Sequence, residues 1–269
     1  MARGNPILSR AEQDATQSNG YSATYPGAPV APGGYPQTGV PARPARTMTM
    51  DDVIVKTGVT FLILLVGAVI GWQLTGTLMI AGFGAALVAF VLAMFITFKK
   101  SSSPILVILY SVFEGLFLGA ISKWYAAYGE ANGNGNLVAQ AVGATLVVFA
   151  VMLVVYKTGI IKVTARTMKV FMIMMISYGV IALISLVTAF FGVGGGWGFY
   201  GVSGIGLLLS LFAVGLASFS LVIDFDGIVR TTAYGVEEKE SWRMAFGLMV
   251  SLVWLYLEIL RMLAILSRN

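Results

Sequence analysis

The sequence contains no cysteine and no histidine, and only 11% of its 269 residues are charged. The absence of cysteine excludes disulfides and thiolate metal sites. The absence of histidine removes the side chain that usually titrates near neutral pH. A response of this protein to pH near neutrality must therefore come from carboxylates in unusual surroundings. A soluble domain carries roughly 25% charged residues. This chain therefore has too little charge to cover a water-facing surface.

Hydrophobic residues make up 58% of the sequence, and the mean hydropathy is +0.86. Seven apolar runs are each long enough to cross a bilayer core of about 30 Å, and they lie at 54–74, 77–98, 104–125, 137–156, 168–191, 203–229 and 243–266. Backbone groups in lipid must be hydrogen-bonded within the segment, which predicts helices. The run Val147–Val155 does not alternate as a barrel strand would. The predicted fold class is all-α, a polytopic membrane protein with seven transmembrane helices.

Residues 1–47 differ in composition from the rest and contain seven of the eight prolines, with glycine and tyrosine between them. Such a segment buries too little apolar area to offset its chain entropy, so we expect a disordered tail. A tail that docks on a membrane protein partner is the alternative. The first residues lack the apolar core of a signal peptide. The sequence thus predicts a cytoplasmic tail, 1–47, followed by a seven-helix domain, 48–269.

The basic residues are unequally distributed between alternate loops. Ten lie on one predicted side: Lys56, Lys99, Lys100, Lys157, Lys162, Arg166, Lys169, Arg230, Lys239 and Arg243. The other side has Lys123 and Arg268. Cytoplasmic loops carry the excess of basic residues, which predicts an N-terminus inside and a C-terminus outside. The net charge of +5 therefore indicates a lipid bilayer, with no nucleic-acid partner.

A few ionisable residues fall well inside apolar runs. They are Glu114 in the third run, Asp224 and Asp226 in the sixth, and Glu258 with Arg261 in the seventh. Charges in hydrocarbon are costly and rare, and they usually mark a functional site. We therefore take these five residues as the candidate site.

Two carboxylates within hydrogen-bonding distance in a dry site share a proton, because both cannot stay ionised. Asp224 and Glu258, on consecutive helices, are the candidate pair for such a pH-sensitive gate. Without the proton, their oxygens would be hard ligands suited to calcium or another cation, with Asp226, Glu114 and Arg261 along a secondary ion path. Two alternatives stay open. Glu258 and Arg261 are three residues apart and can pair locally, and Asp224 and Asp226 point about 200° apart on a helix.

The two acid-bearing segments resemble the signature end of the Bax inhibitor-1 (transmembrane Bax inhibitor motif) family, in its bacterial branch. D-F-D-G-I at 224–228 is similar to the family's D-T-Q-x-I, and L-Y-L-E at 255–258 to its L-Y-L-D. TMDDVIVKTG at 49–58, FEGLFLGAIS at 113–122 and the tail resemble an actinobacterial subgroup. The resemblance covers about residues 48–268. It implies seven helices, an inside N-terminus and a calcium leak in the plasma membrane, controlled by paired carboxylates.

The sequence departs from this family in three respects. First, Glu258 stands where the family has an aspartate. Second, the predicted second helix has no arginine that could anchor the carboxylate pair, and Arg261 is the candidate to take the place of that arginine. Third, the predicted helix ends place Asp224 and Glu258 at depths in the bilayer that differ by about 10 Å or more.

Other function classes remain as alternatives. The resemblance to bacterial relatives implies, as one alternative, a membrane interaction protein that modulates a membrane protease or a stress response. A further alternative is a proton-coupled transporter. Such transporters are often built from internal repeats, and this sequence shows no convincing repeat. No nucleophile–base pair or metal cluster indicates an enzyme, and no cofactor is expected beyond calcium as a permeant ion. The Gly67–Gly71 and Gly115–Gly119 pairs predict close helix packing.

Overall fold

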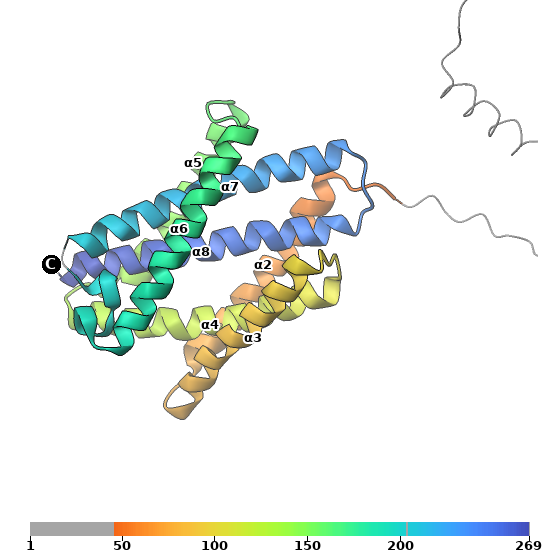
Figure 1. Cartoon of the computed structure of the whole chain (residues 1–269). Helices are drawn as coiled ribbons and strands as arrows, with labels where there is room; N and C mark the ends of the chain where they lie inside the picture. The colour runs from red at the N-terminus through yellow and green to blue at the C-terminus, as the bar shows by residue number, and fades with distance from the viewer. Residues whose placement is uncertain (1–45, 203, 269) are drawn as a thin grey trace, which may run out of the picture. The chain divides into compact units, whose positions relative to one another are not determined.

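The computed structural model describes residues 46–202 and 204–268, and this part of the chain is built from helices (Figure 1). The long helices are α2 (Met50–Gln73), α3 (Thr77–Phe98), α4 (Pro104–Ala131), α5 (Leu137–Lys157), α6 (Ala165–Phe190), α7 (Ile205–Ala233) and α8 (Glu240–Arg268). All seven are long and apolar enough to cross a membrane, which confirms the predicted fold class.

Several helices extend beyond the apolar runs because local capping lengthens them. Helix α2 begins at Met50, where Thr49 and Asp52 form a reciprocal capping box. Helix α7 continues to Ala233 and ends where Gly235 adopts a positive φ of 65°. Helix α8 then begins at Glu240. These polar turns carry no hydropathy signal, so the apolar runs alone place the ends too far inward.

Helix α8 is the central element of the bundle (Figure 1). It packs against α2, α4, α5 and α7. In its most apolar window 56% of the residues are buried, against 11% in α5 and 17% in α6. Helices α5 and α6 therefore leave most of their surface for lipid, and α8 is the helix on which a polar side chain is best shielded.

Helices α2 and α4 pack closely through their glycines. A Cβ atom added to Gly71 would lie 2.2 Å from the carbonyl oxygen of Leu116, and one added to Gly115 would lie 2.3 Å from that of Leu64. Contacts of this length are not tolerated, so the two backbones approach because these side chains are absent. The predicted packing role of the two glycine pairs is confirmed.

The segment before α2 is tied to the loop between α7 and α8. Thr47 forms an isolated antiparallel bridge with Glu237, and the Met48 amide donates a 2.8 Å hydrogen bond to the carbonyl of Val236. Lys56 extends this link, with its Nζ atom 3.0 Å from a carboxylate oxygen of Glu238. The predicted disordered tail and its docking role lie outside the described residues, apart from positions 46 and 47, which are held in this bridge.

Candidate functional site

Glu258 lies in the middle of α8 and is 2% exposed. Its Oε1 atom accepts a 2.6 Å hydrogen bond from the Tyr178 hydroxyl of α6 and a 3.2 Å hydrogen bond from the indole Nε1 of Trp254. Arg261 donates to both carboxylate oxygens, at 3.2 and 3.0 Å. Three side chains from two helices thus surround this carboxylate with donors, which suits its charged form.

Arg261 completes the cluster. Its NH1 atom forms an ion pair of 3.0 Å with Glu258, one helical turn away on α8, so the local pair that the sequence left open is present. The guanidinium also lies over the ring of Tyr200, 4.4 Å from the centroid, in a cation–π contact. The Arg261 side chain is 28% exposed, while that of Glu258 is 3% exposed. The arginine therefore connects the buried carboxylate to the surface of the bundle.

Tyr200 reaches this cluster because the glycine-rich loop folds onto α6. The loop forms two short 3-10 helices, η1 (Val193–Gly196) and η2 (Gly198–Gly201). Gly198 has a φ of 60°, and a Cβ atom added there would lie 2.1 Å from the carbonyl oxygen of Ser185. The Phe199 amide donates a 3.0 Å hydrogen bond to the hydroxyl of Ser185. This close contact brings the Tyr200 hydroxyl to 2.8 Å from that of Tyr178.

Asp224 lies on α7 and faces α8 at a different level from that of Glu258. A Cβ atom added to Gly247 would lie 3.8 Å from its Oδ1 atom, and the hydroxyl of Ser251 is its polar neighbour. Its Oδ2 atom is buried, and within the described part of the chain it has no hydrogen-bond partner. An orphaned carboxylate oxygen in a buried position is costly for the stability of a fold.

Asp224 and Glu258 are not joined by any hydrogen bond among the described residues. Glu258 lies seven residues beyond Ser251 on the same helix, which corresponds to about 10 Å along the axis. This agrees with the depth difference expected from the sequence. The structure therefore separates the two acids into one carboxylate with several donors and one with an unpaired oxygen.

The other two candidate acids lie apart from this cluster. Asp226 forms an ion pair of 2.6 Å with Arg230, and the guanidinium of Arg230 also donates a 2.8 Å hydrogen bond to the carbonyl of Val163. Glu114 lies on α4 and is 9% exposed. Asp226 thus belongs to the basic-loop end of α7, and Glu114 belongs to the interior.

Sequence reasoning missed Tyr178, Tyr200 and Trp254. Trp254 could have been found, because it precedes Glu258 by four residues and so shares its helical face. Tyr178 is a lone hydroxyl in an apolar run, which is a weak signal. Tyr200 carried no signal, because its position depends on the folded conformation of the glycine-rich loop.

A metal would need more ligands than this arrangement brings together. Within residues 46–202 and 204–268, no group of three or more histidine, cysteine, aspartate or glutamate side chains could hold an ion. Calcium sites use six to eight oxygen ligands.

Comparison with known proteins identifies one family. The family model described as Bax inhibitor 1 like matches residues 5–268, which is nearly the whole chain and begins well before the region of resemblance noted in the sequence. No curated protein matches the chain.

Proposed function

The chain belongs to the Bax inhibitor 1 like family, and from this premise we propose that it conducts a proton-sensitive leak of cations, with calcium as the candidate ion. The molecule is a multi-pass integral membrane protein, with seven apolar helices in the part of the chain that the structure describes. We place it in the plasma membrane of a bacterium. The basic loops would face the cytoplasm under the positive-inside rule.

The observation that carries this proposal is the environment of Glu258. Its carboxylate is almost fully buried, yet it accepts hydrogen bonds from both α6 and α8. Outside this contact, α6 packs mainly against η1, η2 and α7. The hydrogen bond from Tyr178 is therefore a specific polar tie between a peripheral helix and the central one.

Proton binding to Glu258 would loosen this tie. A neutral carboxyl loses its ion pair with Arg261 and becomes a weaker acceptor for the Tyr178 hydroxyl. Helix α6 and the loop that carries Tyr200 would then be free to shift relative to α8. On this mechanism acidification favours the conducting state. In this proposal Asp224 and Glu258 act at separate levels of α8, in place of the direct sharing of a proton expected from the sequence.

Asp224 would contribute to the cation path itself. The Oδ1 atom of its carboxylate lies beside Gly247 of α8, and its Oδ2 atom has no hydrogen-bond partner among the described residues. A partly dehydrated cation could use this Oδ2 atom as a transient ligand. Conduction requires ligation strong enough to admit an ion and weak enough to release it. Glu114 and Asp226 remain secondary candidates for the path, and the pairing of Asp226 with Arg230 makes it the weaker of the two.

The test is calcium flux into proteoliposomes that contain the full-length protein, measured between about pH 5 and pH 8, a range in which perturbed carboxylates can titrate. Glu258→Gln should abolish the pH dependence and leave a leak close to the acid level at every pH. Asp224→Asn should lower the flux and keep its dependence on pH. Glu130→Gln is the control, because Glu130 is exposed at the end of α4.

Two results would contradict the proposal. Unchanged flux and unchanged pH response in both acid variants would exclude the carboxylates from gating and conduction. A calcium flux no greater than that of protein-free liposomes at every pH would exclude the leak itself.

A further inference from the structure

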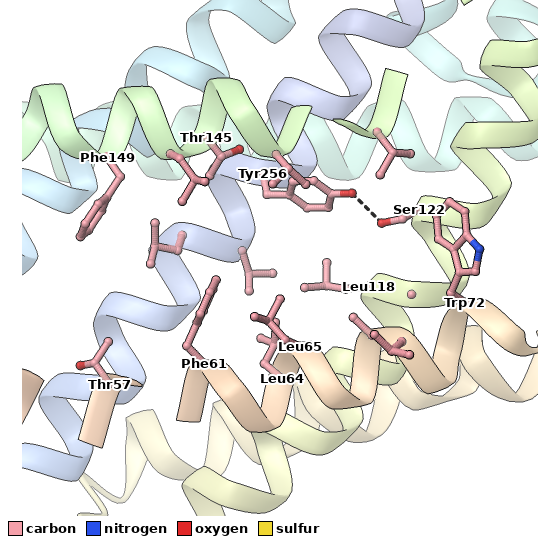
Figure 2. A pocket seen from close by; sticks show the side chains of 18 of the residues that line it. Thr57, Phe61, Leu64, Leu65, Trp72, Leu118, Ser122, Thr145, Phe149 and Tyr256 are labelled. Carbon is pink, nitrogen blue, oxygen red and sulfur yellow. Dashed lines mark hydrogen bonds between the residues drawn. The ribbon is translucent and has the colours of Figure 1, made fainter. Parts of the chain in front are cut away.

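A cavity of about 690 Å³ lies between α2 and α5, with α4 and α8 supplying its remaining walls (Figure 2). It follows α2 from Thr57 to Gln73 and α5 from Val138 to Phe149. The candidate acids and Arg261 do not line it. It is therefore separate from the carboxylate cluster.

The lining of the cavity is apolar. None of the described residues that line it is charged. Ser122 and Tyr256 have their hydroxyls 2.6 Å apart and satisfy each other, as Figure 2 shows. The Thr145 hydroxyl donates a 2.8 Å hydrogen bond to the carbonyl of Ala141. The buried hydroxyl of Thr57 has no hydrogen-bond partner among the described residues. A lining without charge and with so few free polar groups favours an apolar occupant over a hydrated ion.

The cavity is continuous with the lipid-facing surface. Leu65 and Val69 of α2 line it and are 44% and 64% exposed, and Val142 and Leu146 of α5 line it and are 46% and 56% exposed. All four lie within membrane-spanning helices. At this depth the surrounding medium is hydrocarbon, so the molecules that can enter sideways are those of the bilayer.

The dimensions of the cavity distinguish among occupants. The sixteen residue steps from Thr57 to Gln73 extend about 24 Å along α2, close to the hydrocarbon thickness of about 30 Å. A helix of a second chain, about 10 Å across and of that length, would fill roughly 1,900 Å³. The cavity encloses only part of such a helix, so the rest of the helix would project from it into the bilayer. A single long and thin apolar chain suits both the length and the volume.

We propose that this cavity binds one acyl chain of a membrane phospholipid, held between α2 and α5 as a structural lipid. The site goes beyond the proposed leak and does not depend on it. It would fill the space between two helices that both contact α8, and so hold α2 and α5 at a fixed separation.

The test is native mass spectrometry of the full-length protein, purified in mild detergent and incubated with 1-palmitoyl-2-oleoyl-phosphatidylglycerol. Gly58 lines the cavity and has open space at its Cβ position, so Gly58→Leu places a side chain where the acyl chain would lie. Leu146→Trp narrows the cavity from α5. Each should weaken phospholipid retention by roughly tenfold, because several methylene groups lose their dispersion contacts.

Gly143→Leu is the matched control. Gly143 is also a helical glycine with open space at its Cβ position, and it does not line the cavity. This variant should retain one phospholipid per chain, as the unmodified protein does. Leu146→Trp decides the question if Gly58→Leu fails to fold.

Three outcomes would overturn the proposal. The unmodified protein could lose all phospholipid on dilution in detergent. The two cavity variants could retain phospholipid as well as Gly143→Leu does. A second copy of the chain or a co-purified peptide could account for the retained mass and be lost in the cavity variants.

Discussion

The hydroxyl of Tyr178 donates a 2.6 Å hydrogen bond to the carboxylate of Glu258 and so joins α6 to α8. Both side chains are buried, at 7% and 2% exposure. A hydrogen bond to a buried charged group contributes about 1.5–3 kcal/mol. Because α6 lies at the edge of the bundle, this contact has more influence on its position than the same bond would have inside a tightly packed core.

Tyr178→Phe is expected to lower the free energy of unfolding by about 1.5–3 kcal/mol, because it removes the donor and keeps the ring. It should also raise the calcium leak at neutral pH, since α6 loses its tie without any proton binding. Unfolding in detergent micelles and flux in proteoliposomes provide the two measurements.

Tyr256→Phe is the control for this change. It removes a different, half-buried hydroxyl, the partner of Ser122, and its loss should lower stability by about 0.5–1.5 kcal/mol without changing the pH response of the leak. An equal rise of the leak in both variants would show that general loosening, and not the contact with Glu258, opens the path.

The ion pair between Glu258 and Arg261 should show strong energetic coupling. Glu258→Gln, Arg261→Met and the double variant form a thermodynamic cycle, and we expect a coupling energy of about 1–3 kcal/mol because the carboxylate is shielded from water. The free energies are measured by unfolding in the same detergent.

Asp226 and Arg230 provide the comparison pair, with side chains that are 18% and 58% exposed. Exposed pairs contribute about 0–1 kcal/mol, so Asp226→Asn and Arg230→Met should be nearly additive. Equal coupling in the two cycles would mean that burial of Glu258 does not strengthen its ion pair.

The sequence predicted the helices and the glycine contacts because both depend on local properties. Hydropathy over about 20 residues is enough to identify a span, and glycine spaced by four residues lies on one face of its helix, where backbones can approach. Gly71 and Gly115 were predicted to allow such packing and do so. The candidate acids were found for the same reason, because a charge in an apolar run is visible without knowledge of the fold.

The partners of those acids could not be predicted, because they depend on the registers between helices. The turn through Gly235 and the start of α8 at Glu240 set which residues of α8 face Asp224. Tyr200 reaches Arg261 only because Gly198 packs against Ser185. Such contacts between distant segments leave no periodic signal in a single sequence.

Asp224→Asn should have the opposite effect on stability to Glu258→Gln. The Oδ2 atom of Asp224 is buried without a partner among the described residues, so removal of its charge lowers a desolvation cost, and we expect unchanged stability or a gain of up to about 1–3 kcal/mol. Glu258→Gln removes a charge that Arg261 and Tyr178 bind, and should be destabilising. A loss of stability in Asp224→Asn would show that the contact of the charged carboxylate with Ser251 outweighs the desolvation cost.

The approach of α2 and α4 should be sensitive to a single methyl group. Gly71→Ala would place a Cβ atom 2.2 Å from the Leu116 carbonyl oxygen, and because that atom belongs to the backbone, the helices must separate. Overpacking of this kind costs about 1–3 kcal/mol. Thermal unfolding in detergent should therefore show a lower midpoint.

Gly84→Ala reverses the sign of this effect and is the matched control. Gly84 lies in α3 with nothing within 4 Å of its Cβ position, so the change meets no neighbour. Alanine favours a helix over glycine by about 1 kcal/mol, and the midpoint should stay constant or rise. If Gly71→Ala also raised the midpoint, α2 and α4 would have to lie farther apart than their glycines indicate, and the helix propensity of alanine would then outweigh packing at this contact.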